Sequence, residues 1–550
     1  MGTQPMTVEY SNAAASLQLT NSAETKRWIA SLPLTNVQLA QQSLSAQVSA
    51  LAATQLPALE RLKILETLKD ALVFLQEESA KRFAGRPLPL NAAEAAAWNN
   101  VITLWQDLGR NYQACLQAYR DGDLAIAPHV ALVSMRCLRY LGCTMLDYCR
   151  AYRQVPGAMW RTLHELYSFS EQHGYARIRV QDSFAQQDPD SSCAESYMQA
   201  LLIQLANPYS LSVRQMSFVH RWLEKWTALV GLGTQPLPAS PIPSLVVDLA
   251  SSSGVTLAGD IEPQPNLRYL DLEQLSKTLR QVINLLKQGQ TPVQLGLGSD
   301  ARQPGCENLL MLLYVQWCRA GTARNEDRCI AEAPVSVCLG IPAVHYHING
   351  CHTFRQPGEL TSRERQDLDT FGYLSRIEGA ARDKGEEELE SWEILNHSAS
   401  GFMCMQRRLN DKARVSHNQL LAVRRANSTQ FSLGLVQWLK IDENNSLSCG
   451  VRLFPGIPQA IAVRPSNFNP AGHNRYERAV LLPQVAVPNT PATLILPAGW
   501  FQNGRFVEVH SDRKQVAKLL NLLEKGGDFD RGTITIVKEF VGLGPDKLLK

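Results

Sequence analysis

The hydrophobic period of the chain differs on the two sides of a segment rich in proline, glycine and serine at residues 231–244. Before this segment, apolar residues recur at steps of three and four, as in the leucine stripe over residues 59–75. This spacing is typical of amphipathic helices. After about residue 332 the pattern becomes short apolar runs separated by turn residues, which is typical of antiparallel strands. A chain of 550 residues with one helical and one strand-like hydrophobic pattern is too long and too varied to form a single hydrophobic core.

We therefore expect a multidomain α+β protein with an N-terminal all-α region, a short α/β segment, a small antiparallel β-barrel with a helical insertion, and a small C-terminal β/α section. The expected boundaries are 1–230 for the helical domain, 231–314 for the linker and small α/β segment, 315–465 for the barrel, and 466–550 for the C-terminal β-rich section.

Within these sections several elements are predicted individually. Val335–Leu339 and Val344–Ile348 read as strands, since each is a short apolar run bounded by turn residues. A capping box followed by apolar residues at helical spacing predicts an inserted helix at about 361–382. Val516–Leu523 is predicted to be a helix within the last section.

Composition limits the classes of function. Lysine and arginine total 54 against 51 aspartate and glutamate, a net charge of +3, so nothing indicates a surface for a nucleic-acid polymer. No stretch has the length of a membrane helix, and no basic leader precedes an apolar core at the start. The twelve cysteines are scattered without a Cys-x-x-Cys pair, which is typical of reduced, buried thiols. We expect a cytoplasmic protein without membrane insertion.

One cluster has the atoms of a zinc site: Cys338, His345, His347, Cys351 and His352. On the predicted strand, the two histidines at 345 and 347 share one face, whereas structural zinc sites usually gather close ligand pairs on turns. We favour histidines on the polar face of a strand, and no metal.

The sequence contains no recognisable catalytic motif. The Gly-Leu-Gly at 296–298 lacks both the third glycine of a dinucleotide fingerprint and the Gly-Lys-Ser/Thr of a phosphate loop, so a turn is the better interpretation. No nucleophile elbow, zinc-protease motif or Gly-Gly-Asp-Glu-Phe motif is present. We expect no catalysis and no cofactor.

Two short motifs in the β-rich region suggest a binding site. Arg324 and Arg328 form Arg-x-x-x-Arg just ahead of the first barrel strand, and Asn396, Ser398 and Gly401 form Asn-x-Ser-x-x-Gly at the end of a later one. Guanidinium groups pair with phosphate oxygens and stack on purines. Asparagine and serine offer the mixed donor and acceptor edges that a base requires, and glycine allows close approach of the backbone. The pattern favours a planar, anionic ligand.

These motifs resemble the signature of the PilZ domain family, which binds the bacterial second messenger cyclic di-GMP. The runs 418–423, 431–438 and 449–454 look like the later strands of that family's six-stranded barrel. The resemblance covers about residues 315–460, in the C-terminal half of the chain. It implies that Arg324 and Arg328 lie in a flexible stretch and close over the ligand, while Asn396 and Ser398 read guanine edges.

The chain departs from the family in spacing, since Asn396 lies 68 positions after Arg328. A long insertion between strands costs little stability, because loop-closure entropy grows only logarithmically with length. Residues 401–440 carry seven basic side chains against Asp411, which would attract an anionic ligand if the charges line the site. A solvated basic strand face is the alternative.

The leading hypothesis is a cytoplasmic bacterial cyclic di-GMP receptor that transmits the signal through its helical domain to an unidentified protein partner. The alternative is a ligand-blind PilZ-like adaptor that binds only proteins. An enzyme with a regulatory barrel ranks last.

Overall fold

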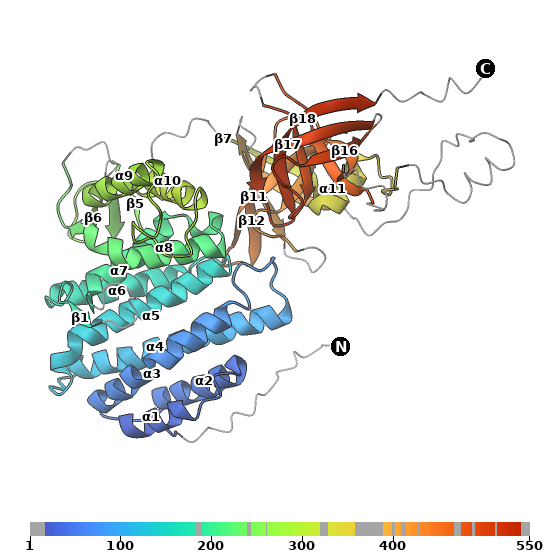
Figure 1. Cartoon of the computed structure of the whole chain (residues 1–550). Coiled ribbons are helices and arrows are strands. Elements are labelled where there is room, and N and C mark those ends of the chain that lie inside the picture. Colours follow the sequence, from blue (N-terminus) through green and yellow to red (C-terminus); the bar gives the residue numbers. More distant parts are fainter. Residues whose placement is uncertain are drawn as a thin grey trace, which may run out of the picture. The chain divides into compact units, whose positions relative to one another are not determined.

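The computed structural model describes residues 17–540 with internal gaps. The gaps are 182–189, 239–243, 260, 320–327, 358–388, 399–401, 409–413, 427, 467–474, 487–489 and 512–513. The chain divides into two compact units (Figure 1). Unit 1 comprises Met1–Arg86 and Leu90–Arg324, and unit 2 comprises Pro87–Pro89 and Asn325–Lys550.

Unit 1 begins with helices, as predicted. They are α1 (Ser22–Ala30), α2 (Val37–Ala53), α3 (Ala58–Ala80), α4 (Ala92–Arg120), α5 (Val130–Arg150), α6 (Gly157–Gln172), α7 (Cys193–Leu205) and α8 (Val213–Trp226). On α3, the leucine stripe from Leu62 to Leu75 is buried, which confirms the interpretation of its spacing. The Asn91 and Ser192 side chains cap α4 and α7, each in a reciprocal capping box with a glutamate three residues on.

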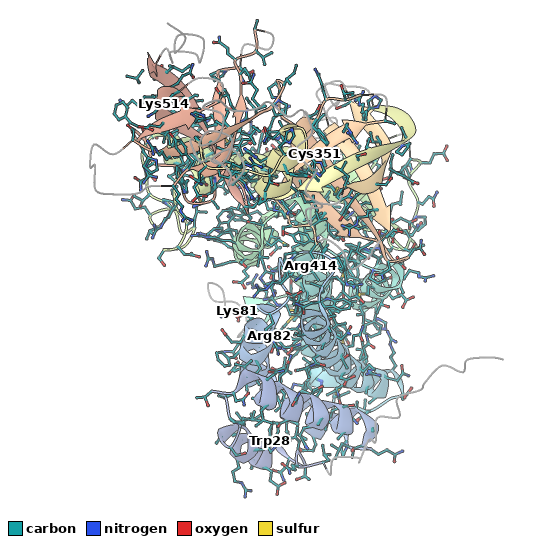
Figure 2. The ribbon with its side chains drawn as sticks, turned by 90° about the vertical axis from the view of Figure 1, so that its right-hand side faces the viewer. Trp28, Lys81, Arg82, Cys351, Arg414 and Lys514 are labelled. Atoms are coloured by element: carbon teal, nitrogen blue, oxygen red, sulfur yellow. The ribbon has the colours of Figure 1, made fainter. Side chains whose placement is uncertain are left out.

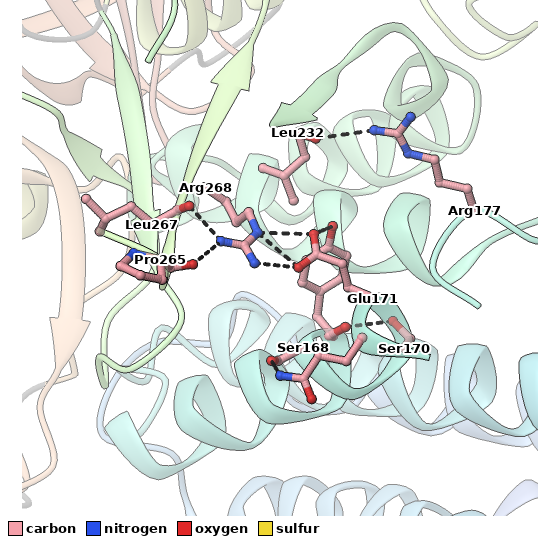
Figure 3. A network of polar contacts seen from close by, with 10 residues as sticks. Ser168, Ser170, Glu171, Arg177, Leu232, Pro265, Leu267 and Arg268 are labelled. Carbon is pink, nitrogen blue, oxygen red and sulfur yellow. Dashed lines mark hydrogen bonds and ion pairs between the residues drawn. The ribbon is translucent and has the colours of Figure 1, made fainter. Parts of the chain in front are cut away.

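The small α/β segment packs on these helices. Its antiparallel sheet has the order β3-β6-β4-β5 (Gly231–Gly233, Leu267–Asp271, Leu245–Asp248, Thr256–Leu257), followed by α9 (Glu273–Lys287) and α10 (Gly305–Cys318). Arg268 on β6 donates to both carboxylate oxygens of Glu171 on α6 and to the carbonyl oxygens of Pro265 and Leu267 (Figure 3). The Trp317 indole of α10 donates to the Leu202 carbonyl of α7 over 2.9 Å. Residues 231–318 therefore share one compact unit with the helices.

Unit 2 contains the predicted six-stranded antiparallel barrel. Among the described residues it closes in the order β10-β11-β12-β9-β8-β7. The strands are β7 (Arg328–Leu339), β8 (Glu390–Ser398), β9 (Phe402–Arg408), β10 (Leu420–Arg425), β11 (Ser432–Ile441) and β12 (Ser446–Leu453). The helix predicted at about 361–382 lies outside the described residues.

A second closed barrel follows, in the order β13-β14-β15-β18-β17-β16. Its strands are β13 (Gln459–Pro465), β14 (Glu477–Leu482), β15 (Thr493–Pro497), β16 (Phe506–His510), β17 (Lys514–Lys525) and β18 (Phe529–Phe540). The helix predicted over Val516–Leu523 is wrong, because these residues lie in β17. Apolar residues at 516, 519, 520 and 523 imitate a helical period. Pairing with β16 and β18 on both sides overrides that local pattern.

The strand predicted over Val344–Ile348 is also wrong. These residues belong to helix α11 (Gly340–Ile348), which starts at a glycine with φ of +79°. The apolar run is short, and a short run cannot distinguish a strand from a buried helix. Ile341, Val344 and His345 form the buried face of this helix.

Helix α11 lies in a hydrophobic cluster that both barrels share. From the first barrel come residues such as Leu420, Leu433 and Phe454, and from the second come Val480, Leu482, Ile495 and Phe529. The rings of Phe454 and Phe529 meet edge to face at 6.3 Å. The two barrels therefore share this hydrophobic cluster, and the second barrel has a further cluster of its own.

Unit 2 also includes the tripeptide Pro87–Pro89, which the sequence places between α3 and α4. Leu88 is fully buried and exchanges two backbone hydrogen bonds with Val415, of 2.8 and 2.7 Å. Arg414, labelled in Figure 2, donates to the carbonyl oxygens of Pro87 at 2.6 Å and Pro89 at 3.0 Å.

We predict that His345 makes unit 2 less stable in acid. Burial of the imidazole lowers the pKa of His345 from 6.5 to about 4, an effect that the hydrogen bond from Nε2 to the Ile461 carbonyl oxygen opposes. The unfolded chain then binds more protons than the folded chain between these values, so stability falls as pH drops from about 6.5 to about 4. The loss is at most about 1.4 kcal/mol per pH unit.

Denaturant unfolding of His345→Gln across this range should show a weaker pH dependence than the wild type. The matched control is His352→Gln, since His352 is exposed. Equal pH dependence of the wild type and His345→Gln would contradict the prediction.

Candidate ligand-binding site

The start of β7 lies beside the end of β8. The antiparallel register pairs Arg328 with Ser398 and Ile330 with Asn396. Directly opposed residues of antiparallel strands have Cβ atoms about 5 Å apart. The backbone thus brings Arg328, Asn396 and Ser398 together, although Asn396 lies 68 positions after Arg328 in the sequence.

Two of the predicted site residues, Arg324 and Gly401, lie outside the described residues. The backbone of Arg328 is placed but its side chain is not described. The side chains of Asn396 and Ser398 are half-buried. The structure therefore places the backbones of Arg328, Asn396 and Ser398 side by side, and their role in binding stays a prediction.

Asn396 belongs to a row of residues that crosses four strands. The register aligns Asn396 of β8 with Cys404 of β9, Cys404 with Gly450 of β12, and Gly450 with Trp438 of β11. Leu447, Cys449 and Val451 of β12 are buried in the barrel. Gly450 alternates with them, so this row faces the outer surface of the barrel.

The Trp438 indole covers Gly450. A Cβ atom built on Gly450 would lie 1.9 Å from the indole Nε1, so only glycine leaves room for the ring there. The indole is half-buried, and three strand spacings, about 14 Å, separate its backbone from that of Asn396. The part of the indole that remains exposed could stack on a nucleobase. Trp438 cannot be singled out from the sequence, because its signal, a tryptophan opposite a glycine on the neighbouring strand, depends on the strand register.

The basic cluster of residues 401–440 is not a uniform charged rim. Arg407 is buried, and its Nε lies 3.1 Å from the Glu390 carboxylate. Burial lowers the pKa of Arg407, an effect that Glu390 opposes. Arg414 binds the carbonyls of Pro87 and Pro89, and the Arg424 guanidinium lies 5.1 Å from the centre of the Phe431 ring. Among the described members, Arg425 is exposed.

His345 and His347 of the possible zinc cluster do not lie on a strand face, because they belong to α11. Cys351, which Figure 2 labels, follows that helix. Its Sγ lies 3.8 Å from His347 Nδ1. The buried Cys338 thiol points to the Ala422 carbonyl oxygen. Within the part of the chain that the structure describes, no three potential ligands converge on one point. The Gly-Leu-Gly segment is a turn, with φ of +69° at Gly296 and +107° at Gly298, as predicted.

Comparison with known proteins adds three matches in chain order. Residues 23–237 match the family described as "Cyclic-di-GMP receptor FimW, N-terminal domain", residues 256–378 match "Cyclic-di-GMP receptor FimW, middle PilZ domain", and residues 461–536 match "FimW C-terminal beta-barrel domain". The chain contains a PilZ domain.

The PilZ match lies in the middle of the chain and not strictly in its C-terminal half, so the expected location was partly wrong. It includes Arg324 and Arg328 and ends before Asn396. The C-terminal match coincides with the second barrel, β13–β18.

A relative spans almost the whole chain. The cyclic-di-GMP receptor FimW of Pseudomonas aeruginosa is 21% identical over 539 residues, which cover 90% of this chain and 87% of the relative. That protein is named as a receptor and not as an enzyme. No solved structure matches.

We predict that Gly450→Ala displaces Trp438. The added methyl group would overlap the indole, so the ring must leave Gly450, at a cost of about 1–3 kcal/mol in the free energy of unfolding. Denaturant unfolding and acrylamide quenching of Trp438, isolated by subtraction of the Trp438→Phe spectrum, would measure both effects. Gly109→Ala on α4 is the control, because a Cβ there meets no atom within 4 Å.

Proposed function

We propose that this chain is a bacterial cyclic di-GMP receptor that binds the dinucleotide on its first barrel and has no catalytic activity of its own. The observation that carries the proposal is the register of β7 and β8, which pairs Arg328 with Ser398 and sets Asn396 two residues away on the same face. The FimW relative, named as a receptor for this ligand, supports the choice of ligand.

The chemistry of the ligand fits the residues at this place. Cyclic di-GMP presents two anionic phosphates and two planar guanines. Arg324 and Arg328 would pair with phosphate and stack on guanine. Asn396 and Ser398 would bind guanine edges, Gly401 would allow the backbone to approach, and Trp438 would stack on a base.

The position of the arginine pair suggests how binding could be transmitted. The last residue of unit 1 is Arg324 and the longer part of unit 2 begins at Asn325, so the Arg-x-x-x-Arg motif lies at the junction of the two units along the chain. A ligand that holds both arginines would restrict the chain at this junction. Ligand binding shifts a conformational equilibrium through such differential contacts. In this proposal the helical unit passes the change to a protein partner in the cytoplasm.

Membrane insertion forms no part of this proposal. Among the helices that the structure describes, none combines the length and hydrophobicity needed to cross a membrane.

The alternative function is a ligand-blind adaptor in which the barrels and helices only bind proteins. One observation favours the adaptor: Arg407 and Arg414 make contacts within the protein, so their charges stabilise the fold and do not attract a ligand.

Titration of the full chain with cyclic di-GMP by calorimetry tests the proposal. We expect saturable binding that Arg324→Ala and Arg328→Ala each weaken by roughly tenfold to a hundredfold, because each removes charge-assisted hydrogen bonds. Arg425→Ala, which removes an exposed arginine of β10, should bind like the wild type. Absence of saturable binding to the wild type would favour the adaptor.

Trp438→Ala should weaken the same binding by roughly tenfold, since stacking on one base contributes about 1–3 kcal/mol. Trp438→Phe should retain part of the affinity because the phenyl ring still stacks. If Trp438→Ala binds with wild-type affinity, the indole is not part of the site. The role of the arginine pair is tested separately, by Arg324→Ala and Arg328→Ala.

A further inference from the structure

The outward position of Trp438 depends on an irregularity in β11. Val436 pairs with Val451 of β12, and Trp438 pairs with Gly450, so Gln437 is an extra residue between two successive pairs. Side chains alternate between the faces of a strand, and Val436 is buried in the barrel. Without the extra residue, position 438 would face the barrel interior. The bulge therefore turns the indole outward.

The bulge is held by contacts of Gln437. Its side-chain oxygen accepts a hydrogen bond from Arg452 Nε at 3.0 Å, and its carbonyl oxygen accepts one from His417 Nε2 at 3.2 Å. Arg452 lies on β12 and His417 lies just before β10, so both donors are close to Gln437 in the first barrel. Arg452 makes a further contact, with the second barrel.

The other end of the Arg452 guanidinium binds Glu524, at the end of β17 in the second barrel. Glu524 also lies 3.5 Å from Arg531 of β18, and the Arg531 guanidinium stacks at 4.3 Å from the centre of the Phe454 ring. The Glu524 carboxylate is about one-fifth exposed and Arg452 about three-tenths, so solvent screens this pair only in part. A continuous series of polar contacts thus joins the second barrel to the bulge.

We propose that Glu524 is a positioning residue for the ligand site: through Arg452 and Gln437, the second barrel fixes the bulge that presents Trp438. The link to ligand affinity rests on the proposed function, whereas the link to the position of Trp438 does not. The second barrel then sets the affinity of the first barrel for a planar base without touching the ligand.

Two measurements on the full chain test this inference. The first is acrylamide quenching of Trp438, obtained by subtracting the spectrum of the matching Trp438→Phe variant, and it needs no ligand. The second is the affinity for cyclic di-GMP by calorimetry. We expect Glu524→Gln to change the quenching of Trp438 and to weaken binding by roughly fivefold or more.

Glu508→Gln is the matched control. Glu508 lies in the same barrel with a similarly exposed carboxylate, and it pairs with Arg464 at 2.7 Å and Lys514 at 3.2 Å, away from Gln437. This variant should leave both readouts unchanged. Gln437→Ala should reproduce the effect of Glu524→Gln, and the double variant should show no additional loss, because both act through one series of contacts.

The outcomes separate the two proposals. If Glu524→Gln changes the quenching of Trp438 but the wild type does not bind the dinucleotide, the positioning role stands and the receptor function fails. If the wild type binds and Glu524→Gln matches Glu508→Gln in both readouts, the positioning role is overturned. If Glu524→Gln does not fold, Gln437→Ala decides by the same two measurements, and wild-type behaviour of that variant overturns the inference.

Discussion

The second unit depends on the hydrophobic cluster that α11 shares with both barrels. Side chains of both barrels, such as Phe454 and Phe529, are buried against one another in this cluster, so each barrel covers apolar surface of the other. Around this cluster lie groups that require it: Asp528, whose carboxylate accepts the Leu420 amide and whose pKa burial raises, and Arg531, which stacks on Phe454. The polar contacts between the barrels are thus secondary to apolar burial.

The sequence predicted the class of each large section because hydrophobic period is a local property. Leucines on α3 repeat at helical spacing and are buried, and the runs that became β10, β11 and β12 are bounded by turn residues. Hydrophobic period gave the wrong secondary structure where contacts with neighbouring strands or barrels determine it. Val516–Leu523 has the spacing of a helix and pairs as a strand, and Val344–Ile348 has the composition of a strand and forms a helix against both barrels.

The candidate site was predictable in part for the same reason. Arg328, Asn396 and Ser398 were identifiable as residue types in a spaced motif, and the register of β7 and β8 places their backbones together. Trp438 was not identifiable, because its outward direction depends on one extra residue in β11 and on a glycine twelve positions later on the next strand. Neither the extra residue nor the pairing with Gly450 can be recognised from the sequence of one strand alone.

The tripeptide Pro87–Pro89 has a consequence for how this chain can be divided. Because these residues complete the second unit while the residues before and after them complete the first, the two units are interleaved along the chain. A fragment that begins at residue 325 would lack Leu88, and Val415 and Arg414 would lose the backbone partners that Leu88, Pro87 and Pro89 supply. Cutting the chain at any one position therefore leaves at least one unit incomplete. A gene fusion or duplication that transfers only one side of such a cut would not transfer both units whole.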